Sequence, residues 1–448
     1  MGERIRILAL DHFSGQDREA LVAAGADGFA WRTIPYWRFR DPANEIFPPE
    51  VREGLESWAR PELAEHRRTF AAWCRRMLTR LYLEWPFDVL LLPSDSFYYV
   101  RALPDVCHEL GIPVFVAQKE TTITDHSMAE HAPQVHAFAP FISDRMTVCS
   151  ERHKQFWVEA GTEPTSIEVT GQPRFDVYAQ PRSQPARGRR TVLFLSYEPD
   201  AYLLETADRK IGWLDLRDET ERVLYSSKDH AFDVVVKLHP LQNRAAEAAA
   251  FEMKAGGNPR IRLAPEDADT RELILEADAV VGFQTTALYE AMAAGKPIAY
   301  TAWGASYERF APLLIPFDQR DDLIQVVRSG EELASWLREP PSVDATQHVR
   351  RLTFVEEMLG LFDGKAATRT LQAIRSETEK WSSRAATSSR RRMLGRARLF
   401  ARPMLMAAAA VQSAALRVGA TLPGRVGNSA ASRAPHHTER LAALRRAG

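Results

Sequence analysis

The sequence predicts an α/β protein with two doubly wound parallel sheets, one in each of two domains that face each other across a cleft. Continuous apolar runs such as FDVLLLP at 87–93 are typical of strands buried on both faces of a parallel sheet. Segments with helical periodicity lie between these runs, and such alternation implies right-handed crossover connections. A chain of 448 residues also exceeds what one hydrophobic core usually holds, so two domains are expected.

The first domain is predicted over residues 1–180. Its expected strands are 4–10, 87–93, 114–117, 146–149 and 166–171. Its expected helices are 61–84, which starts at a proline and carries apolar residues at helical spacing, and segments near 97–110 and 151–160. Residues 26–60 are rich in Trp, Pro and Arg with little period, which predicts a long irregular insertion.

The second domain is predicted over residues 181–380, after a Pro-, Arg- and Ser-rich boundary at 180–190. Its expected strands are 191–195, 233–238, 261–263 and 279–283. Its expected helices lie near 215–227, 270–277, 321–338 and 345–380. The last of these segments either completes the second domain or returns to the first.

Charge is distributed unevenly along the chain. From Lys380 onward there are fourteen Lys and Arg residues against one acid, Glu439, a net charge of +13. The whole chain carries −1, so residues 1–379 carry −14. The folded part therefore lacks the basic character expected of a nucleic-acid binder, and the tail is a separate cationic module.

The tail, residues 381–448, contains an apolar segment at 393–422 that is interrupted by four arginines and Pro403. Its uncharged run is far shorter than the roughly 20 residues that span a bilayer. A basic amphipathic helix lying on an anionic membrane surface and a disordered cationic tail are both compatible with this composition. Residues 423–448 are expected to be disordered.

The cysteines and the N-terminus indicate the compartment. Cys74, Cys107 and Cys149 are widely spaced, which suits a reducing cytosol. The apolar run before Asp11 is too short for a signal peptide, so it is read as a first strand. We expect a cytoplasmic protein that is peripheral on the inner face of the plasma membrane.

The stretch ADAVVGFQTTALYEAMAAGKPIAY, residues 277–300, carries the clearest chemistry. It predicts a strand, a polar turn of Gln284, Thr285 and Thr286, a helix and a stop at a Gly-Lys-Pro sequence. Unpaired backbone N–H groups at the start of a helix attract an anion, and the two hydroxyls would add donors. Glu290 is one residue out of register for a capping box and is therefore predicted to meet another group.

Lys237 and His239 end the strand at 233–238, and Pro240 follows. Side chains alternate along a strand, so both residues are predicted on one face at its exit. A cation and an imidazole side by side suit a diphosphate. The alternative is that His239 bonds to a loop while the lysine extends to solvent.

The Asp-Ala-Asp sequence at 267–269 matches the DxD pattern of some metal-dependent enzymes. Asp269 with Glu272 three residues on is an N-cap signature, so we interpret it as a cap. No metal-ligand spacing, P-loop, GxSxG or GxGxxG sequence is present.

Three segments in order, VTGQPRFD, VVVKLHP and ADAVVGFQTTALYEAMAAGKPI, resemble bacterial surface and capsular polysaccharide glycosyltransferases of the GT-B fold. The pattern is similar to the CDP-glycerol glycerophosphotransferase group, and it covers about residues 85–300. The resemblance implies two Rossmann-like domains. The glycerophosphotransferases often carry Trp-His-Gly where this chain reads AQKETTITDH, which sets it apart from that group.

The resemblance also implies roles for particular residues. Gly171, Arg174 and Asp176 match the segment at the domain junction. The donor-binding residues it implies are Lys237, His239, Gln284, Thr285, Thr286 and Glu290, with Glu290 on the ribose. Candidates for the catalytic base in the first domain are Asp95, Glu120 and His126, of which Asp95 is preferred.

The implied reaction is metal-independent transfer of a sugar from a nucleotide donor to a surface polysaccharide or lipid-linked glycan acceptor. The nucleotide sugar would be a substrate, and no cofactor is expected. The alternatives are a CDP-glycerol or polyol-phosphate transferase, a nucleotide-sugar 2-epimerase, and a non-catalytic binding or scaffold protein that kept the fold.

Overall fold

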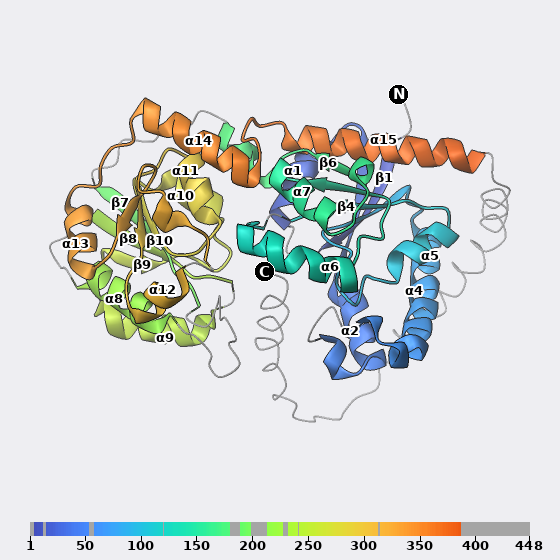
Figure 1. The fold of residues 1–448 in the computed structure, drawn as a ribbon, viewed down its shortest axis with the longest axis horizontal. Coiled ribbons are helices and arrows are strands. Elements are labelled where there is room, and N and C mark those ends of the chain that lie inside the picture. Colours follow the sequence, from blue (N-terminus) through green and yellow to red (C-terminus); the bar gives the residue numbers. More distant parts are fainter. Residues whose placement is uncertain are drawn as a thin grey trace, which may run out of the picture.

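The computed structural model describes residues 4–11, 15–52, 58–119, 121–179, 189–198, 213–226, 232–240, 242–311 and 314–386. Figure 1 shows two α/β units side by side, each with a central sheet flanked by helices. Both sheets have six strands, and every pair of neighbouring strands is parallel. The predicted fold class of two doubly wound, Rossmann-like domains is therefore confirmed. The predicted boundary between residues 180 and 181 lies outside the described residues.

The first sheet has the order β2-β1-β3-β4-β5-β6. Its strands are β1 (Ile5–Asp11), β2 (Phe29–Pro35), β3 (Val89–Leu92), β4 (Val114–Ala117), β5 (Arg145–Val148) and β6 (Ile167–Val169). The helices around it are α1 (Gly15–Ala24), α2 (Trp37–Ile46), α4 (Ala64–Glu84), α5 (Leu103–Glu109), α6 (Ala132–Phe138) and α7 (Glu151–Glu159). All four residues of β3 are buried, which is why its sequence is uniformly apolar.

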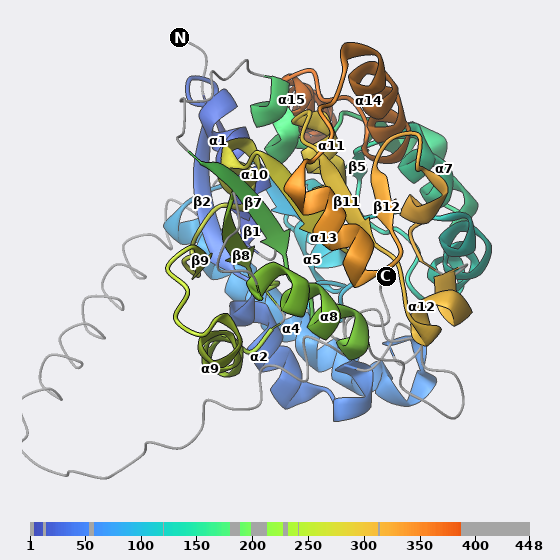
Figure 2. The same cartoon turned by 90° about the vertical axis from the view of Figure 1, so that its left-hand side faces the viewer.

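The second sheet has the order β12-β11-β10-β7-β8-β9, and Figure 2 presents it toward the viewer. Its strands are β7 (Arg190–Leu195), β8 (Phe232–Lys237), β9 (Ile261–Leu263), β10 (Ala279–Gly282), β11 (Ile298–Thr301) and β12 (Gln325–Val327). Its helices are α8 (Leu214–Tyr225), α9 (Arg244–Ala255), α10 (Thr270–Glu276), α11 (Ala287–Ala293), α12 (Ala305–Phe310), α13 (Gly330–Arg338) and α14 (Ala345–Leu359). The two sheets have separate hydrophobic cores.

The predicted irregular insertion at 26–60 is wrong over much of its length. Residues 29–35 form β2, which pairs with β1 along seven residues, and residues 37–46 form α2. As an edge strand, β2 is only partly buried, so it lacks the continuous apolar run that marks the other strands. In α2 the buried residues Phe39 and Ala43 lie one turn apart despite Pro42 between them.

The range 321–338 was predicted as one helix, but it holds β12 followed by α13. Three residues of strand are too short to show a period of two. The range 345–380 holds two helices, α14 and α15 (Ala366–Ala386), separated at Gly360.

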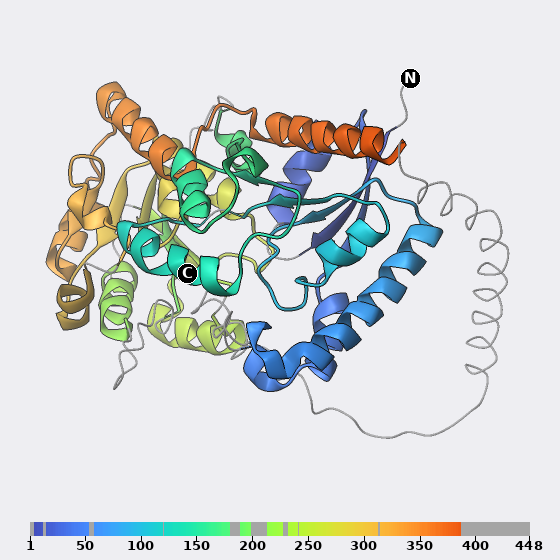
Figure 3. The same ribbon diagram turned by 45° about the vertical axis from the view of Figure 1, so that its right-hand side comes forward.

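The last helix, α15, packs on the first unit and not on the second. Leu371 and Ile374 share a core cluster with Ile5 and Ile7 of β1. Figures 1 and 3 show α15, coloured orange-red, lying along the first unit beyond α14. The chain therefore crosses between the units twice, once after β6 and once after α14.

Candidate functional site

The order of the strands identifies the point in each sheet where a ligand is expected. In the second sheet, β8 and β9 lie on one side of β7, while β10, β11 and β12 lie on the other. In the first sheet, the order changes direction between β1 and β3. Ligands of open parallel sheets bind beyond the carboxyl ends of the strands at such switch points. The predicted turn at 284–286 follows β10 and so lies at the switch point of the second sheet.

Gln284 gives this turn its shape. Its φ is +43°, and among the described residues it is the one non-glycine with a positive φ. Its side chain is buried and donates to the Tyr300 hydroxyl at 2.7 Å and to the Ile315 carbonyl at 3.0 Å, and it accepts from the Ile315 N–H at 2.9 Å. These three bonds offset the cost of a backbone conformation that most side chains avoid. The amide of Gln284 is thus directed into the protein.

The two threonines of the turn differ in their bonding. The Thr285 hydroxyl accepts from the N–H of Ala287 at 3.3 Å, which is local capping. Thr286 immediately precedes α11 and makes no side-chain capping bond with the helix. Both residues are half-buried. Thr286 is therefore the hydroxyl of this turn that its own helix does not use.

Glu290 lies in α11 and is almost fully buried, with a relative exposure of 4%. One carboxylate oxygen lies 3.2 Å from the Arg174 guanidinium, and the other accepts from the Tyr178 hydroxyl at 2.8 Å. Burial raises the pKa of Glu290, while Arg174 and the Tyr178 hydroxyl lower it. The out-of-register carboxylate does meet another group, but both of its oxygens bond to the segment between the two units. A bond to a ribose remains a prediction.

Gly171, Arg174 and Asp176 lie where the chain passes from one unit to the other. Gly171 has φ +80°, and a Cβ there would lie 3.0 Å from the Cβ of Ala366 and 3.2 Å from the Leu361 carbonyl. Asp176 accepts from the N–H groups of Ala366 and Ala367, both at 2.9 Å, and so caps the start of α15. This short segment is thereby tied to the last helix as well as to Glu290.

Tyr178 is a residue of this junction that the sequence interpretation missed. It follows Arg174 by four positions within the 3₁₀ segment Pro173–Ala179. That spacing places both side chains where they can reach one carboxylate. The spacing of Arg174 and Tyr178 is visible in the sequence RFDVY. Only the position of α11 shows that the two side chains meet Glu290.

Lys237 and His239 lie at the exit of β8, and both are half-buried. Lys237 donates to the carbonyl of Glu266 at 3.2 Å. Burial lowers the pKa of His239 to about 4, helped by the nearby charge of Lys119, so its imidazole is neutral at pH 7. The pair therefore offers one cation and one neutral ring, and not two cations.

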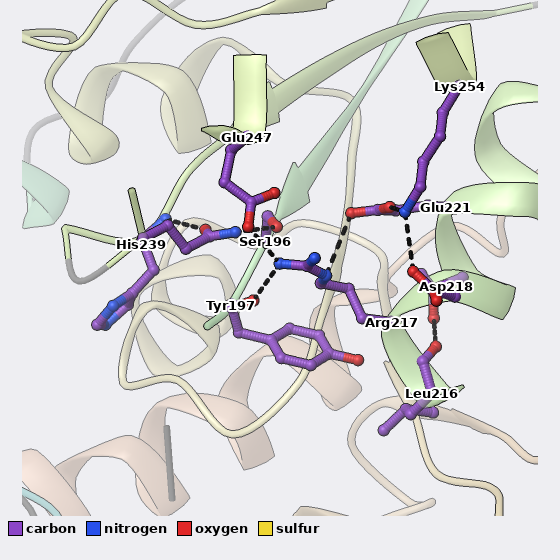
Figure 4. Close-up of polar contacts among 11 residues, drawn as sticks. Ser196, Tyr197, Leu216, Arg217, Asp218, Glu221, His239, Glu247 and Lys254 are labelled. Atoms are coloured by element: carbon purple, nitrogen blue, oxygen red, sulfur yellow. Dashed lines mark hydrogen bonds and ion pairs between the residues drawn. The ribbon is translucent and has the colours of Figure 1, made fainter. Parts of the chain in front are cut away.

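The backbone around His239 is held by the neighbouring strand. Its N–H donates to the Gln242 side chain at 2.6 Å, and Gln242 in turn donates to the Ser196 hydroxyl at the end of β7. Figure 4 shows His239 directed away from the charged network of Arg217, which binds the Tyr197 carbonyl and the Glu247 carboxylate. That network joins α8 to α9 and to the end of β7.

The loop that follows β4 in the first unit contacts the second unit near these residues. Lys119 follows β4 of the first sheet and is close enough to His239 to lower its pKa. Burial raises the pKa of Tyr289 in α11, and the nearby Thr122 side chain offsets part of this rise. The hydroxyls of Thr122 and Tyr289 are both buried and make no hydrogen bond of ordinary geometry within the described part of the chain. The carboxyl end of β4 thus faces β8 and α11 of the other sheet.

The three candidates for a catalytic base in the first unit differ in their position and burial. Glu120 lies outside the described residues. The ring of His126 is half-buried and lies 5.7 Å from that of His131. Asp95 is 1% exposed. One of its oxygens accepts from the N–H groups of Ile142 and Ser143 and from the Ser143 hydroxyl, at 2.9 to 3.0 Å.

The other oxygen of Asp95 is buried without a hydrogen-bond partner among the described residues, and burial raises the pKa of the carboxyl. In this arrangement the Asp95 side chain braces the segment at 142–143 and does not reach the surface. Its role as a base stays a prediction that requires one oxygen to become accessible.

Asp269 is the N-cap of α10 and accepts from the N–H of Arg271 at 2.8 Å, so the interpretation of the DxD sequence as a cap is confirmed. Within the described ranges, no group of three or more His, Cys, Asp or Glu side chains is arranged to hold a metal ion. No helix in those ranges is long and apolar enough to cross a membrane. The tail, residues 387–448, lies outside them.

No protein-family model and no curated protein matches this chain. Solved structures do resemble it. One is a structure of a putative UDP-N-acetylglucosamine 2-epimerase from Listeria monocytogenes, with a TM-score of 0.51 and 15% identity, over 84% of this chain and 98% of that one. Another is S. aureus MnaA with UDP, with a TM-score of 0.48 and 11% identity, over 84% and 97% of the two chains.

A third is Anabaena HepE in complex with UDP-glucose, with a TM-score of 0.47 and 11% identity, over 83% of this chain and 100% of that one. At this level of identity, the likeness to the Listeria structure shows the fold. It extends over both units.

Proposed function

We propose that the chain is an enzyme that acts on a nucleoside diphosphate sugar and holds the nucleotide on its second sheet. The observation that supports this most is the place of the 284–286 turn. It lies at the switch point of a six-stranded parallel sheet, and the end of β4 from the other unit faces this region. Nucleotides are typical ligands of such points, and the similar Listeria structure is described as that of a UDP-N-acetylglucosamine 2-epimerase, which agrees with this class.

The side chains present suit a diphosphate. The Thr286 hydroxyl is a donor that its own helix does not use, and Lys237 and Lys119 supply positive charge from the two sides. The neutral imidazole of His239 can donate one hydrogen bond to an oxygen without adding charge. Charge-assisted hydrogen bonds of this kind are the strong ones in phosphate recognition.

For the reaction, we favour change at the bound sugar itself, as in 2-epimerisation, because the fold likeness to the Listeria structure extends over both units. Sugar transfer is the second candidate. It is favoured by the order of the segments around Arg174, Lys237 and Thr286, which resembles polysaccharide glycosyltransferases. The two reactions differ in one measurable respect, because transfer consumes an acceptor and releases the nucleotide.

The first experiment measures the melting temperature of the chain with UDP, UDP-N-acetylglucosamine, UDP-glucose and CDP-glycerol. A ligand at about 100 times its dissociation constant stabilises the folded state by about 2.7 kcal/mol. We expect a shift with at least one nucleotide that is reduced in Thr286→Ala. Thr353→Ala is the control, because Thr353 is exposed and its hydroxyl bonds to the Val349 carbonyl of its own helix. If no nucleotide raises the melting temperature, the proposal fails.

The second experiment incubates the chain with the nucleotide sugar that binds and follows the sugar by NMR. Appearance of the 2-epimer without release of nucleotide supports epimerisation. Release of nucleotide only when a glycan acceptor is added supports transfer. Asp95→Asn, Glu120→Gln and His126→Ala are then compared for turnover with nucleotide binding retained, which tests the three candidates for the base.

A further inference from the structure

A pocket of about 440 Å³ lies at the outer edge of the first sheet, away from the candidate nucleotide site. It is lined by Arg32, Arg38, Met77, Arg80, Leu81 and Glu84. These residues come from the edge strand β2, the start of α2 and the last turns of α4. In Figure 1, α4 lies on the side of the first unit that is far from the second unit, and Figure 3 shows the blue helices of this region together.

The pocket carries three guanidinium groups and one carboxylate. Glu84 binds Arg80 at 2.8 Å and Arg32 at 3.3 Å, and these two arginines lower the pKa of its carboxyl. One carboxylate cannot neutralise three guanidinium groups, so the pocket keeps a net positive charge. The folded part of the chain is acidic, which makes such a local excess of arginine unusual for this protein.

Arg38 is the arginine that the protein leaves available. It makes no hydrogen bond or ion pair with the described residues, and its guanidinium carbon lies 5.9 Å from the centre of the Trp37 ring. Trp37 is 48% exposed, although it is a large aromatic residue. Arg38 lines the pocket and Trp37 precedes it in the chain, so the pair presents both charge and exposed apolar surface beside the pocket.

Two of the lining residues are apolar. Leu81 is buried and Met77 is half-buried, and both lie on the same face of α4 as Arg80 and Glu84. A volume of this size falls within the range of small-ligand sites. Arginine forks match the oxygens of phosphate groups, and Met77, Leu81 and the neighbouring Trp37 suit a carbon chain attached to that group.

We propose that the Arg32–Arg38–Arg80 pocket binds a phosphate or diphosphate ester. Arg38 and Arg80 would contact its oxygens, with Trp37 and Met77 against its apolar part. The ester could be presented as a lipid headgroup at a membrane or as a soluble phosphate compound. The chemistry of recognition is the same for both, and the experiment distinguishes them.

The test uses the full chain in two arms. Inorganic pyrophosphate is titrated calorimetrically, and flotation is measured with vesicles of phosphatidylcholine that contain one quarter phosphatidic acid, against phosphatidylcholine alone. Arg38→Gln is expected to weaken binding about fivefold, the contribution of one arginine near an anionic surface. If Arg38→Gln weakens vesicle binding alone, the pocket is assigned to lipid headgroups. If it weakens pyrophosphate binding, the pocket is assigned to soluble esters.

Arg309→Gln is the matched control, because Arg309 is also exposed and its guanidinium carbon lies 5.0 Å from the ring of the next residue, Phe310. Pyrophosphate could also bind at the candidate nucleotide site, and vesicles could bind the basic tail. This background binding is the same in both variants. Equal melting temperatures of the two variants exclude unfolding. Binding that is unchanged by Arg38→Gln in both arms, or reduced as much by Arg309→Gln, would overturn the proposal.

Discussion

The guanidinium of Arg174 lies 3.2 Å from the carboxylate of Glu290, and the side chains of both residues are largely buried, with relative exposures of 12% and 5%. Arg174 belongs to the segment that leaves the first sheet, and Glu290 belongs to α11 of the second. The N–H of Arg174 also donates to the buried carboxylate of Asp17 in α1 at 3.0 Å. One residue therefore links an N-terminal helix of the first unit to the helix beside the candidate nucleotide site.

Glu290→Gln is expected to lower the free energy of unfolding by about 3 kcal/mol, because removal of one partner leaves the buried Arg174 charge uncompensated. Tyr178→Phe removes one hydrogen bond to the same carboxylate and should cost about 1 to 2 kcal/mol. Urea unfolding measures both. The double variant should lose less than the sum of the two, since the residues share one group.

The control for this experiment is Glu65→Gln. Glu65 also pairs with an arginine, Arg68, but both side chains are about 70% exposed. Exposed pairs contribute little to stability. A loss in Glu65→Gln as large as that in Glu290→Gln would show that burial does not determine the strength of the Arg174–Glu290 pair.

Stability should fall as the pH decreases from 6.5 to 4. His153 is 1% exposed and burial lowers its pKa to about 4, so in this window the unfolded chain binds a proton that the folded chain does not. The loss attributable to this residue is about 3 kcal/mol. His153→Gln should therefore lose less stability than the unsubstituted chain between pH 7.5 and pH 4, measured by urea unfolding.

His108 provides the opposite sign in the same assay. Its ring bonds to Asp144 at 2.9 Å, and this hydrogen bond raises its pKa. The stabilisation is present at low pH and is lost as the pH rises through the folded-state pKa. His108→Gln should thus lose more stability on acidification than the unsubstituted chain. Parallel pH profiles for all three chains would contradict both assignments.

Gly171→Ala should destabilise the protein more than Gly111→Ala. The two glycines have similar φ values, +80° and +72°, so the conformational penalty of a side chain is nearly equal, at about 1 kcal/mol. A Cβ at 171 also meets Ala366 and the Leu361 carbonyl, while a Cβ at 111 meets nothing within 4 Å. We expect a further loss of about 1 kcal/mol at 171 by thermal or urea unfolding. Equal losses would show that the junction yields to the added methyl group.

Removal of residues 387–448 should leave a folded chain, because α15 and the two cores lie within the residues that remain. The shortened chain should lose most of its sedimentation with anionic vesicles, since the removed residues contain twelve arginines against one acid, Glu439, a net charge of +11. Sedimentation equal to that of the full chain would contradict membrane binding by the tail. Any remaining binding that is sensitive to Arg38→Gln would belong to the pocket on α4.

The sequence by itself determined the fold class and the position of most strands. Buried parallel strands such as β3 and β4 are apolar on both faces, so their amino-acid sequences are sufficient to identify them as strands. The N-cap at Asp269 was also predictable, because it depends only on neighbours in the chain. The edge strand β2 and the short strand β12 were not predictable, because their burial depends on which elements cover them.

Only the tertiary structure decided what Glu290 meets. Its spacing excluded a capping box, but Arg174 and Tyr178 lie more than a hundred positions earlier in the chain. The low pKa of His239 likewise depends on burial and on Lys119 from the other unit. The basic pocket joins residues 32, 38 and 80 from three elements. The repeat of apolar residues along the chain is enough to predict helices and strands. Ion pairs and burial between distant segments depend on how those helices and strands pack, so they cannot be read from the sequence.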